Sequence, residues 1–184
     1  MTKVARSPVG LWPPIPTGCW FNPSPGPLTT QALTLNLLYL WPMYMGACVV
    51  EEVQLQVSTL GASGVLRCGV WADLSGFPDM ATKIWDANTT VSSASTGAKS
   101  WTGQSITFPG GLVWWGMVAQ TAGCTVRSST YGTLHPLILQ PSLTPATNNA
   151  YQGLSIASIS GALPTSGSPV GTAFTHPKIL LQAA

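Results

Sequence analysis

Apolar and polar side chains alternate along much of this chain, which is the pattern of a β-strand with one buried face. The segment 51–58 shows it most clearly. Val53, Leu55 and Val57 point to one side there, and glutamine and serine side chains point to the other. Alternation or a short apolar run predicts strands at 33–37, 38–45, 51–58, 65–71, 83–86, 99–108, 112–119, 124–128 and 178–182.

Segments rich in glycine, proline and serine separate these strands and mark turns and loops. We expect turns or short loops at 61–64, 73–79 and 92–97, a hairpin turn at 109–111, and longer loops at 17–32 and 130–167. Helical periodicity is not sustained beyond about one turn anywhere in the chain. Short strands with such turns indicate an all-β fold, an antiparallel β-sandwich of the jelly-roll type.

The segment 112–119 is apolar on both faces. Its adjacent Trp114 and Trp115 must point to opposite sides of the strand. One ring is expected to fill the core, and the other to lie at a subunit interface or in a ligand groove. The candidate interface or ligand aromatics are Trp71, Trp101 and Trp115.

Residues 1–16 form a separate unit in this interpretation, and 17–184 form one β-sandwich domain. Four prolines between positions 6 and 16 exclude a helix and favour an extended chain near polyproline II. Apolar side chains in such a segment cannot build their own core, so we expect a docking arm; a disordered tail is the alternative. The assembly residues of this arm are Val9, Leu11, Trp12, Pro13, Pro14, Ile15 and Pro16.

The chain is poor in charge, with 7% charged residues against about 25% in an average domain and a formal net charge of +2. A nearly neutral surface associates easily, which suits a subunit of a large assembly. The seven Lys and Arg residues form no patch, so we expect no nucleic acid as a partner. The longest apolar stretch, 37–50, is shorter than the roughly 20 residues of a membrane helix, and we expect no membrane insertion.

Groups for acid–base catalysis are scarce, with five acidic residues and two histidines. Glu51 and Glu52 are neighbours on a strand and face opposite sides. The three aspartates at 73, 79 and 86 lack the spacing of a calcium ladder and are expected to form turns. His135 and His176 each precede a proline in segments that read as loops. We therefore expect no enzyme activity, no catalytic residue and no cofactor.

The four cysteines contain no Cys-x-x-Cys pair, and neither histidine is near them in sequence. A zinc site needs closer spacing, so we expect no metal. Cys48, Cys68 and Cys124 are interpreted as small core residues.

A series of motifs spans most of the chain in a fixed order, at 38–44, 53–59, 66–73, 76–79, 106–115 and 177–181. This order of strands and turns resembles the jelly-roll-like β-sandwich domain of bacteriophage tail and fibre proteins, over roughly 17–184. The resemblance implies a domain that is displayed on a virion and is usually trimeric. Fibre proteins carry a long shaft before this domain, whereas here we expect only the arm at 1–16.

These observations predict a structural bacteriophage virion protein, a minor tail, baseplate or fibre-type subunit that attaches through its arm. We expect a homotrimer, from the two-faced strand and the low charge, bound to other virion structural proteins. A capsid decoration or head-fibre protein is one alternative, and a module that binds a host cell-surface glycan is another. No secretory signal is visible at the start, so the expected location is the virion, assembled in the host cytoplasm.

Overall fold

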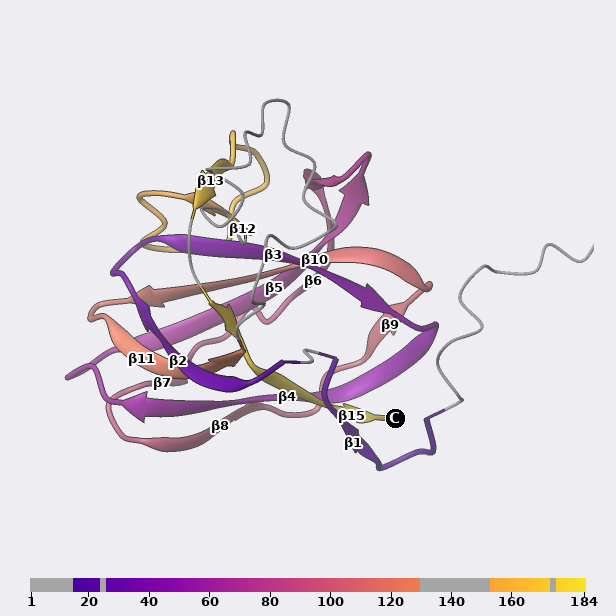
Figure 1. The fold of residues 1–184 in the computed structure, drawn as a ribbon, viewed down its shortest axis with the longest axis horizontal. Helices are drawn as coiled ribbons and strands as arrows, with labels where there is room; N and C mark the ends of the chain where they lie inside the picture. The colour runs from indigo at the N-terminus through magenta and orange to yellow at the C-terminus, as the bar shows by residue number, and fades with distance from the viewer. Residues whose placement is uncertain (1–14, 24–25, 130–152, 173–174) are drawn as a thin grey trace, which may run out of the picture.

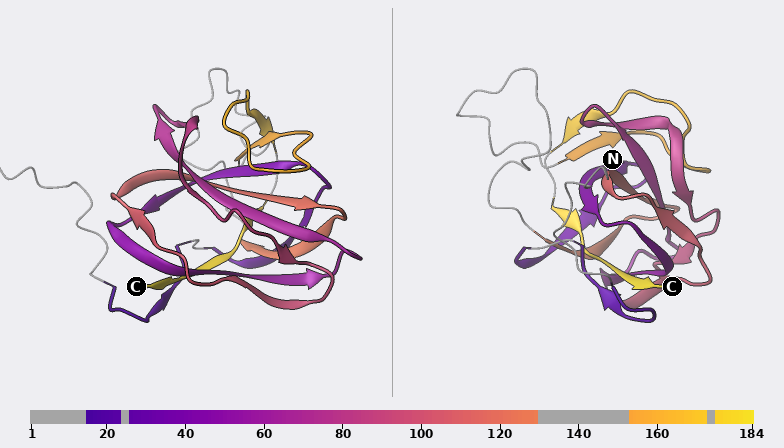
Figure 2. Two further views of the ribbon diagram at one scale, coloured as in Figure 1. Left: turned by 180° about the vertical axis from the view of Figure 1, so that it is seen from behind. Right: turned by 90° about the vertical axis from the view of Figure 1, so that its right-hand side faces the viewer.

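The computed structural model describes residues 15–23, 26–129, 153–172 and 175–184. The strands of these residues form two antiparallel sheets that pack face to face, and the two layers can be followed in Figures 1 and 2. The side chains between the layers form one hydrophobic core, to which both sheets contribute. The prediction of an all-β antiparallel sandwich is therefore confirmed.

Eight strands of the described residues belong to the first sheet, here sheet 1. They are β1 (Trp20–Phe21), β2 (Leu28–Leu33), β4 (Cys48–Thr59), β8 (Gly97–Trp101), β9 (Ile106–Phe108), β11 (Cys124–Ser129), β14 (His176–Pro177) and β15 (Ile179–Ala183). Seven described strands belong to sheet 2. They are β3 (Leu38–Met45), β5 (Val65–Leu74), β6 (Phe77–Asp86), β7 (Val91–Ser92), β10 (Gly111–Gln120), β12 (Gly153–Ile156) and β13 (Val170–Thr172).

The chain crosses between the sheets repeatedly, and its winding is that of a jelly roll. Sheet 1 contains the neighbours β2, β11, β4 and β8, with β9 continuing beside β4, and sheet 2 contains β3, β10, β5 and β6. Among the strands just named, successive ones alternate between the layers, apart from the β5–β6 hairpin and the pair β8 and β9. In sheet 1 the strand β11 lies between β2 and β4, and in sheet 2 the strand β10 lies between β3 and β5. This arrangement is the double Greek key of the jelly roll.

The last strand of the chain fills a fork in sheet 1. β4 and β11 pair only at 57–59 and 125–126 and then diverge. β14 pairs with β11 at Ser128 and Ser129, and β15 pairs with β4 along 50–55. Between these two strands, the Lys178 amide donates a hydrogen bond to the Arg127 carbonyl oxygen at 2.9 Å. The fork therefore brings two cationic residues together.

Three predicted loops are wrong in detail, and one of them, 130–167, contains β12 within its described part. The 73–79 segment is a tight hairpin, because β5 runs to Leu74 and β6 begins at Phe77. Ser75 and Gly76 both have positive φ, of 55° and 88°, as in the type I′ turn that suits the twist of a two-stranded hairpin. The 17–32 segment contains β1 and β2, which are held by pairing with β15 and β11.

The segment from 99 to 120 also differs from the prediction. The expected strand 99–108 is interrupted at 102–105, so that β8 and β9 lie separately along β4. The residues 109–111 do not close a hairpin, because β9 belongs to sheet 1 and β10 to sheet 2. Pro109 and Gly110 instead carry the chain from one layer to the other, and Gly110 has a φ of 88°.

Candidate functional site

The three tryptophans that the sequence offers as candidate interface or ligand aromatics are buried within this chain. Trp71, Trp101 and Trp115 are 0%, 2% and 0% exposed. Trp101 and Trp115 belong to the core between the sheets. There the Trp115 ring stacks on Phe108 with centroids 5.9 Å apart and meets Trp85 at 6.2 Å. These rings stabilise the fold and offer no surface to a ligand.

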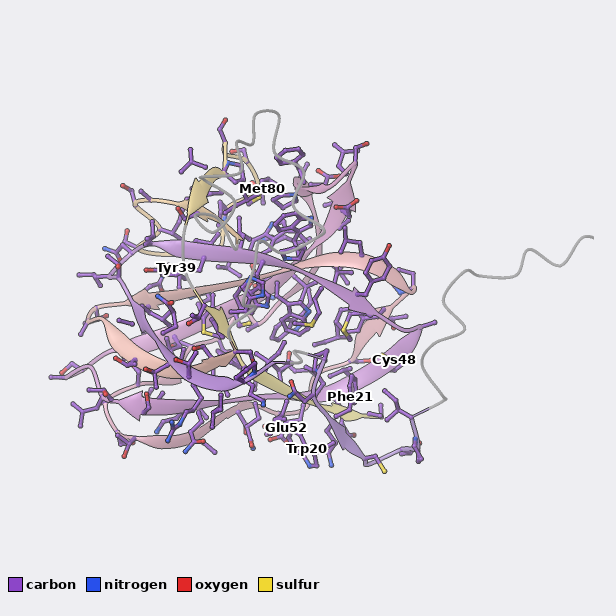
Figure 3. The ribbon with its side chains drawn as sticks, viewed as in Figure 1. Trp20, Phe21, Tyr39, Cys48, Glu52 and Met80 are labelled. Carbon is purple, nitrogen blue, oxygen red and sulfur yellow. The ribbon has the colours of Figure 1, made fainter. Side chains whose placement is uncertain are left out.

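Trp71 and Trp114 lie on the outer face of sheet 2, in a second hydrophobic cluster. Met80, marked in Figure 3, belongs to this cluster, together with Leu154 of β12 and Leu163 from the segment that follows β12 and covers the sheet. Its members are Leu38, Leu40, Trp71, Met80, Trp114, Val118, Leu154 and Leu163. The two-faced strand β10 is therefore covered by the chain's own residues on its outer side.

Two glycines make room for this cover. Gly69 of β5 and Gly116 of β10 are direct partners across the strand pair. A Cβ atom at Gly69 would lie 2.5 Å from Leu163 Cδ1, and one at Gly116 would overlap the Trp71 ring. The recess between the strands thus accepts a leucine and an indole ring.

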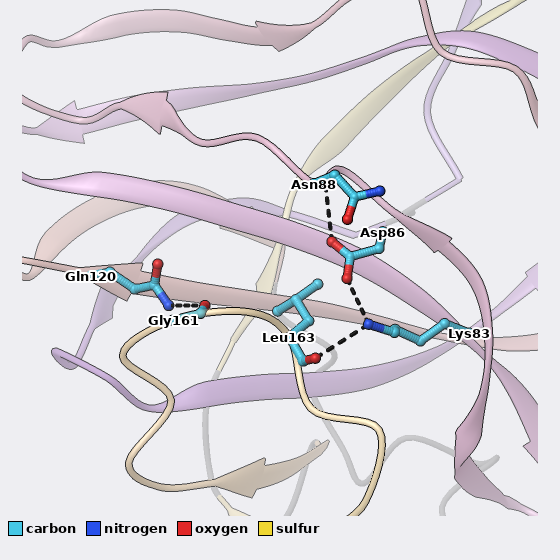
Figure 4. Close-up of polar contacts among 6 residues, drawn as sticks. All are labelled: Lys83, Asp86, Asn88, Gln120, Gly161 and Leu163. Atoms are coloured by element: carbon cyan, nitrogen blue, oxygen red, sulfur yellow. Dashed lines mark hydrogen bonds and ion pairs between the residues drawn. The ribbon is translucent and has the colours of Figure 1, made fainter.

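The covering segment is also fastened by polar contacts, which Figure 4 shows in part. The Gln120 side chain is only 5% exposed, and its Nε2 donates to the carbonyl oxygens of Ile159 at 3.1 Å and Gly161 at 2.7 Å. The Ile159 amide donates to the Asn36 carbonyl oxygen at 2.9 Å. A buried amide that loses these partners would be costly, so the cover is a specific part of the fold.

A further fastening comes from the edge of sheet 2 (Figure 4). The Lys83 ammonium group donates to the Leu163 carbonyl oxygen at 3.2 Å and forms an ion pair with Asp86 at 2.6 Å. The other Asp86 carboxylate oxygen, Oδ1, accepts the Asn88 amide at 3.0 Å. The homotrimer prediction therefore loses one of its two sequence arguments, because the outer face of β10 needs no second subunit to cover it.

The two ends of the folded domain are paired, because β1 and β15 are antiparallel neighbours in sheet 1 (Figure 1). The Gly18 amide donates to the Ala183 carbonyl oxygen at 2.8 Å, and the Ala183 amide donates to the Cys19 carbonyl oxygen at 3.1 Å. The Thr17 hydroxyl donates to the Ala184 carbonyl oxygen at 3.1 Å. The segment 1–16 therefore joins the sandwich beside the C-terminus.

Only two of the predicted arm residues lie within the described part of the chain. Ile15 is half-buried and Pro16 is exposed, and the Pro16 carbonyl oxygen accepts the Cys19 amide at 3.1 Å. The others lie outside the described residues: Val9, Leu11, Trp12, Pro13 and Pro14.

An exposed tryptophan that the sequence reasoning missed lies at this end. Trp20 is 41% exposed on β1, opposite Gln182 of β15, which in turn is opposite Glu52 of β4. Figure 3 marks Trp20 and Glu52 on the outer side of sheet 1. The sequence at 17–32 shows no alternation that would predict this strand. The strand forms because it pairs with β15, which is distant in the sequence.

The aspartates hold turns, as predicted. Asp73 accepts the Gly76 amide at 3.1 Å and the Trp114 indole N–H at 2.8 Å. Asp79 accepts the Ala81 amide at 3.1 Å. Within the described ranges, no group of three or more His, Cys, Asp or Glu residues is placed to hold a metal ion. The described residues also contain no helix long and apolar enough to cross a membrane.

His176 differs from its prediction as a loop residue. It lies in β14, is buried, and stacks on Trp41 with ring centroids 6.3 Å apart. His135 lies outside the described residues.

The cysteines follow their predicted roles, and burial governs their chemistry. Cys68 and Cys124 are buried in the core, Cys48 packs against it, and Cys19 is exposed; all four are free thiols. Burial raises the pKa of the Cys68 thiol, and it raises the pKa values of Cys48 and Cys124 in the same direction.

We expect iodoacetamide to alkylate Cys19 first at pH 8. The attacking species is the thiolate, and a raised pKa keeps Cys48, Cys68 and Cys124 protonated as well as sheltered. Mass spectrometry of timed samples checks this, with urea-unfolded chain as the control in which all four react alike. Alkylation of Cys68 as fast as Cys19 in the native chain would contradict the described core.

Comparison with protein-family models, with curated proteins and with solved structures found no match to this chain.

Proposed function

We propose that this chain is a structural protein of a bacteriophage virion, a minor tail, baseplate or fibre-type subunit that attaches through residues 1–16. The observation that carries the proposal is the antiparallel pairing of β1 with β15. It holds Thr17, the first residue after the arm, beside Ala184 at one end of a jelly roll whose two apolar clusters are buried. Jelly rolls recur as building units of virus particles, and the motif order of this chain supports that use.

A binding role without catalysis fits the chemistry of the described residues. Asp73, Asp79 and Asp86 already accept backbone amides in turns. The buried His176 packs against Trp41. Groups engaged in this way stabilise structure and are poorly placed to move protons for a substrate.

Deletion of residues 1–16 is expected to leave a folded domain that no longer joins the particle. The described core and both sheets begin after this segment, so circular dichroism should still report β-structure. Quantitative mass spectrometry of purified particles measures incorporation, and deletion of residues 2–5 alone, outside the proline-rich part, is the control. Incorporation of the 1–16 deletion at the full level would contradict the proposal.

The capsid alternative differs in stoichiometry. A decoration protein covers a lattice and is present in hundreds of copies, whereas a tail or baseplate subunit is present in a few to dozens. The same mass spectrometry of intact particles, calibrated against the major capsid protein, distinguishes the two. Sedimentation of the purified chain tests the proposed trimer, which now rests on the low charge of the surface and on the motif resemblance.

A further inference from the structure

An open pocket of about 260 Å³ lies on the outer face of sheet 1, away from the apolar cluster of sheet 2. It is centred on the fork between β4 and β11. Arg127 of β11 and Lys178, from the segment that fills the fork, both line it. Gln54 and Gln56 of β4 line it from below, and Leu28 and Leu180 supply apolar walls.

The backbone fixes the two cations as neighbours. The Lys178 amide donates to the Arg127 carbonyl oxygen at 2.9 Å, at the point where the chain passes from β14 to β15. Leu180 is the direct partner of Gln54 on the adjacent strand, so both side chains stand on the same outer face. The pocket is thus built on paired strands and is largely formed before any ligand arrives.

The charges in the pocket are unbalanced. Among the described residues, no carboxylate lies within ion-pair distance of Arg127 or Lys178. The ion pair of the described residues joins Lys83 and Asp86, which lie on sheet 2 and not in the pocket. Glu52 is on the same face as Gln54 but does not line the pocket. In a chain with a net charge of only +2, two neighbouring cations with no acidic partner favour an anionic ligand.

The residues that line the pocket indicate which class of anionic ligand it would bind. A guanidinium group binds a carboxylate with two parallel hydrogen bonds. Gln54 Nε2 donates to the Ser100 hydroxyl at 3.2 Å, and Gln56 is exposed, so neutral hydrogen-bonding groups lie beside the cations. Leu28 and Leu180 can contact the apolar face of a ring. A carboxylate, several hydroxyls and an apolar face occur together in an acidic sugar.

We propose that this pocket binds the carboxylate-bearing sugar of an acidic glycan, with Arg127 and Lys178 holding the carboxylate. The choice of a host-surface glycan over other anions rests on the proposed function, because a displayed virion protein meets such polymers during attachment. The site differs from the tryptophans named in the sequence analysis, which are buried.

The test uses the full purified chain and nuclear magnetic resonance titration with glucuronic acid, galacturonic acid and N-acetylneuraminic acid. Glucose, galactose and N-acetylglucosamine are the neutral counterparts, and acetate and inorganic phosphate are the simple anions. We expect at least one acidic sugar to bind about tenfold or more tightly than its neutral counterpart and than either simple anion.

Variants place the binding in the pocket. Arg127→Gln and Lys178→Gln should each weaken it about tenfold or more, and Arg127→Lys should weaken it less, because it keeps the charge and loses the paired hydrogen bonds. Lys99→Gln is the matched control, because Lys99 donates to Ser95 at the sheet edge and does not line the pocket. Thermal unfolding of each variant verifies that it is folded.

Three results would overturn the proposal: no binding of any acidic sugar, equal binding of neutral sugars or simple anions, or equal loss in Lys99→Gln. Binding is measured on the purified chain and the virion location on particles. A failure here therefore leaves the location of the protein standing, and the absence of the protein from particles would not alter the measured binding.

Discussion

Trp115→Ala is expected to lower the free energy of unfolding by about 3–5 kcal/mol. The ring is fully buried between the sheets, stacks on Phe108 with centroids 5.9 Å apart, and packs against Trp85 at 6.2 Å. Its removal leaves a cavity at the centre of the core, where both sheets limit collapse around the missing atoms. Urea unfolding followed by fluorescence and circular dichroism measures the loss.

Trp20→Ala is the matched control for this substitution. Its side chain is 41% exposed on a short edge strand, so we expect a loss below about 1 kcal/mol. Trp115→Phe keeps part of the ring and should give an intermediate loss, which remains measurable if the alanine variant is unfolded. Equal losses in Trp115→Ala and Trp20→Ala would contradict the assignment of Trp115 to the core.

Gly116→Ala is expected to cost about 1–3 kcal/mol, although it adds a single methyl group in the middle of a strand. The new Cβ would overlap the Trp71 ring and lie 2.9 Å from Leu40 Cδ2. Both neighbours are fully buried beneath the segment fastened by Gln120, so the ring cannot move aside without disturbing the cover.

Gly161→Ala is the control for Gly116→Ala, because a Cβ at Gly161 meets nothing within 4 Å. Its backbone carbonyl still accepts the Gln120 side chain, so the change should alter stability by less than about 0.5 kcal/mol. Thermal and urea unfolding of both variants give the comparison. A neutral Gly116→Ala would show that the chain does not cover the outer face of sheet 2 as described.

Local alternation was sufficient to predict the fold class. The sequence pattern placed the strands around 51–58 and 65–71 by alternation, and it placed the strand around 38–45, which is buried on both faces, by its apolar run. It failed where strands are made by distant partners. β1 and β2 lie in a segment with several prolines, and only their pairing with β15 and β11 makes them strands.

The surface was harder to predict than the core, for a physical reason. A strand with two apolar faces signals that both are covered, but the pattern does not say whether the cover is another subunit or a later part of the chain. The weakly periodic segment after β12 carries Leu163 onto Trp71, which no local pattern indicated. The pocket of Arg127 and Lys178 likewise depends on the fork between β4 and β11.

A cryo-electron microscopy map of purified phage particles that contain this chain tests the virion location most directly. We predict density for a jelly-roll domain on the outside of the tail or baseplate, with the end that carries Thr17 and Ala184 turned toward the particle. Particles that lack such density, or that hold the domain with this end turned to solvent, would contradict attachment through the arm.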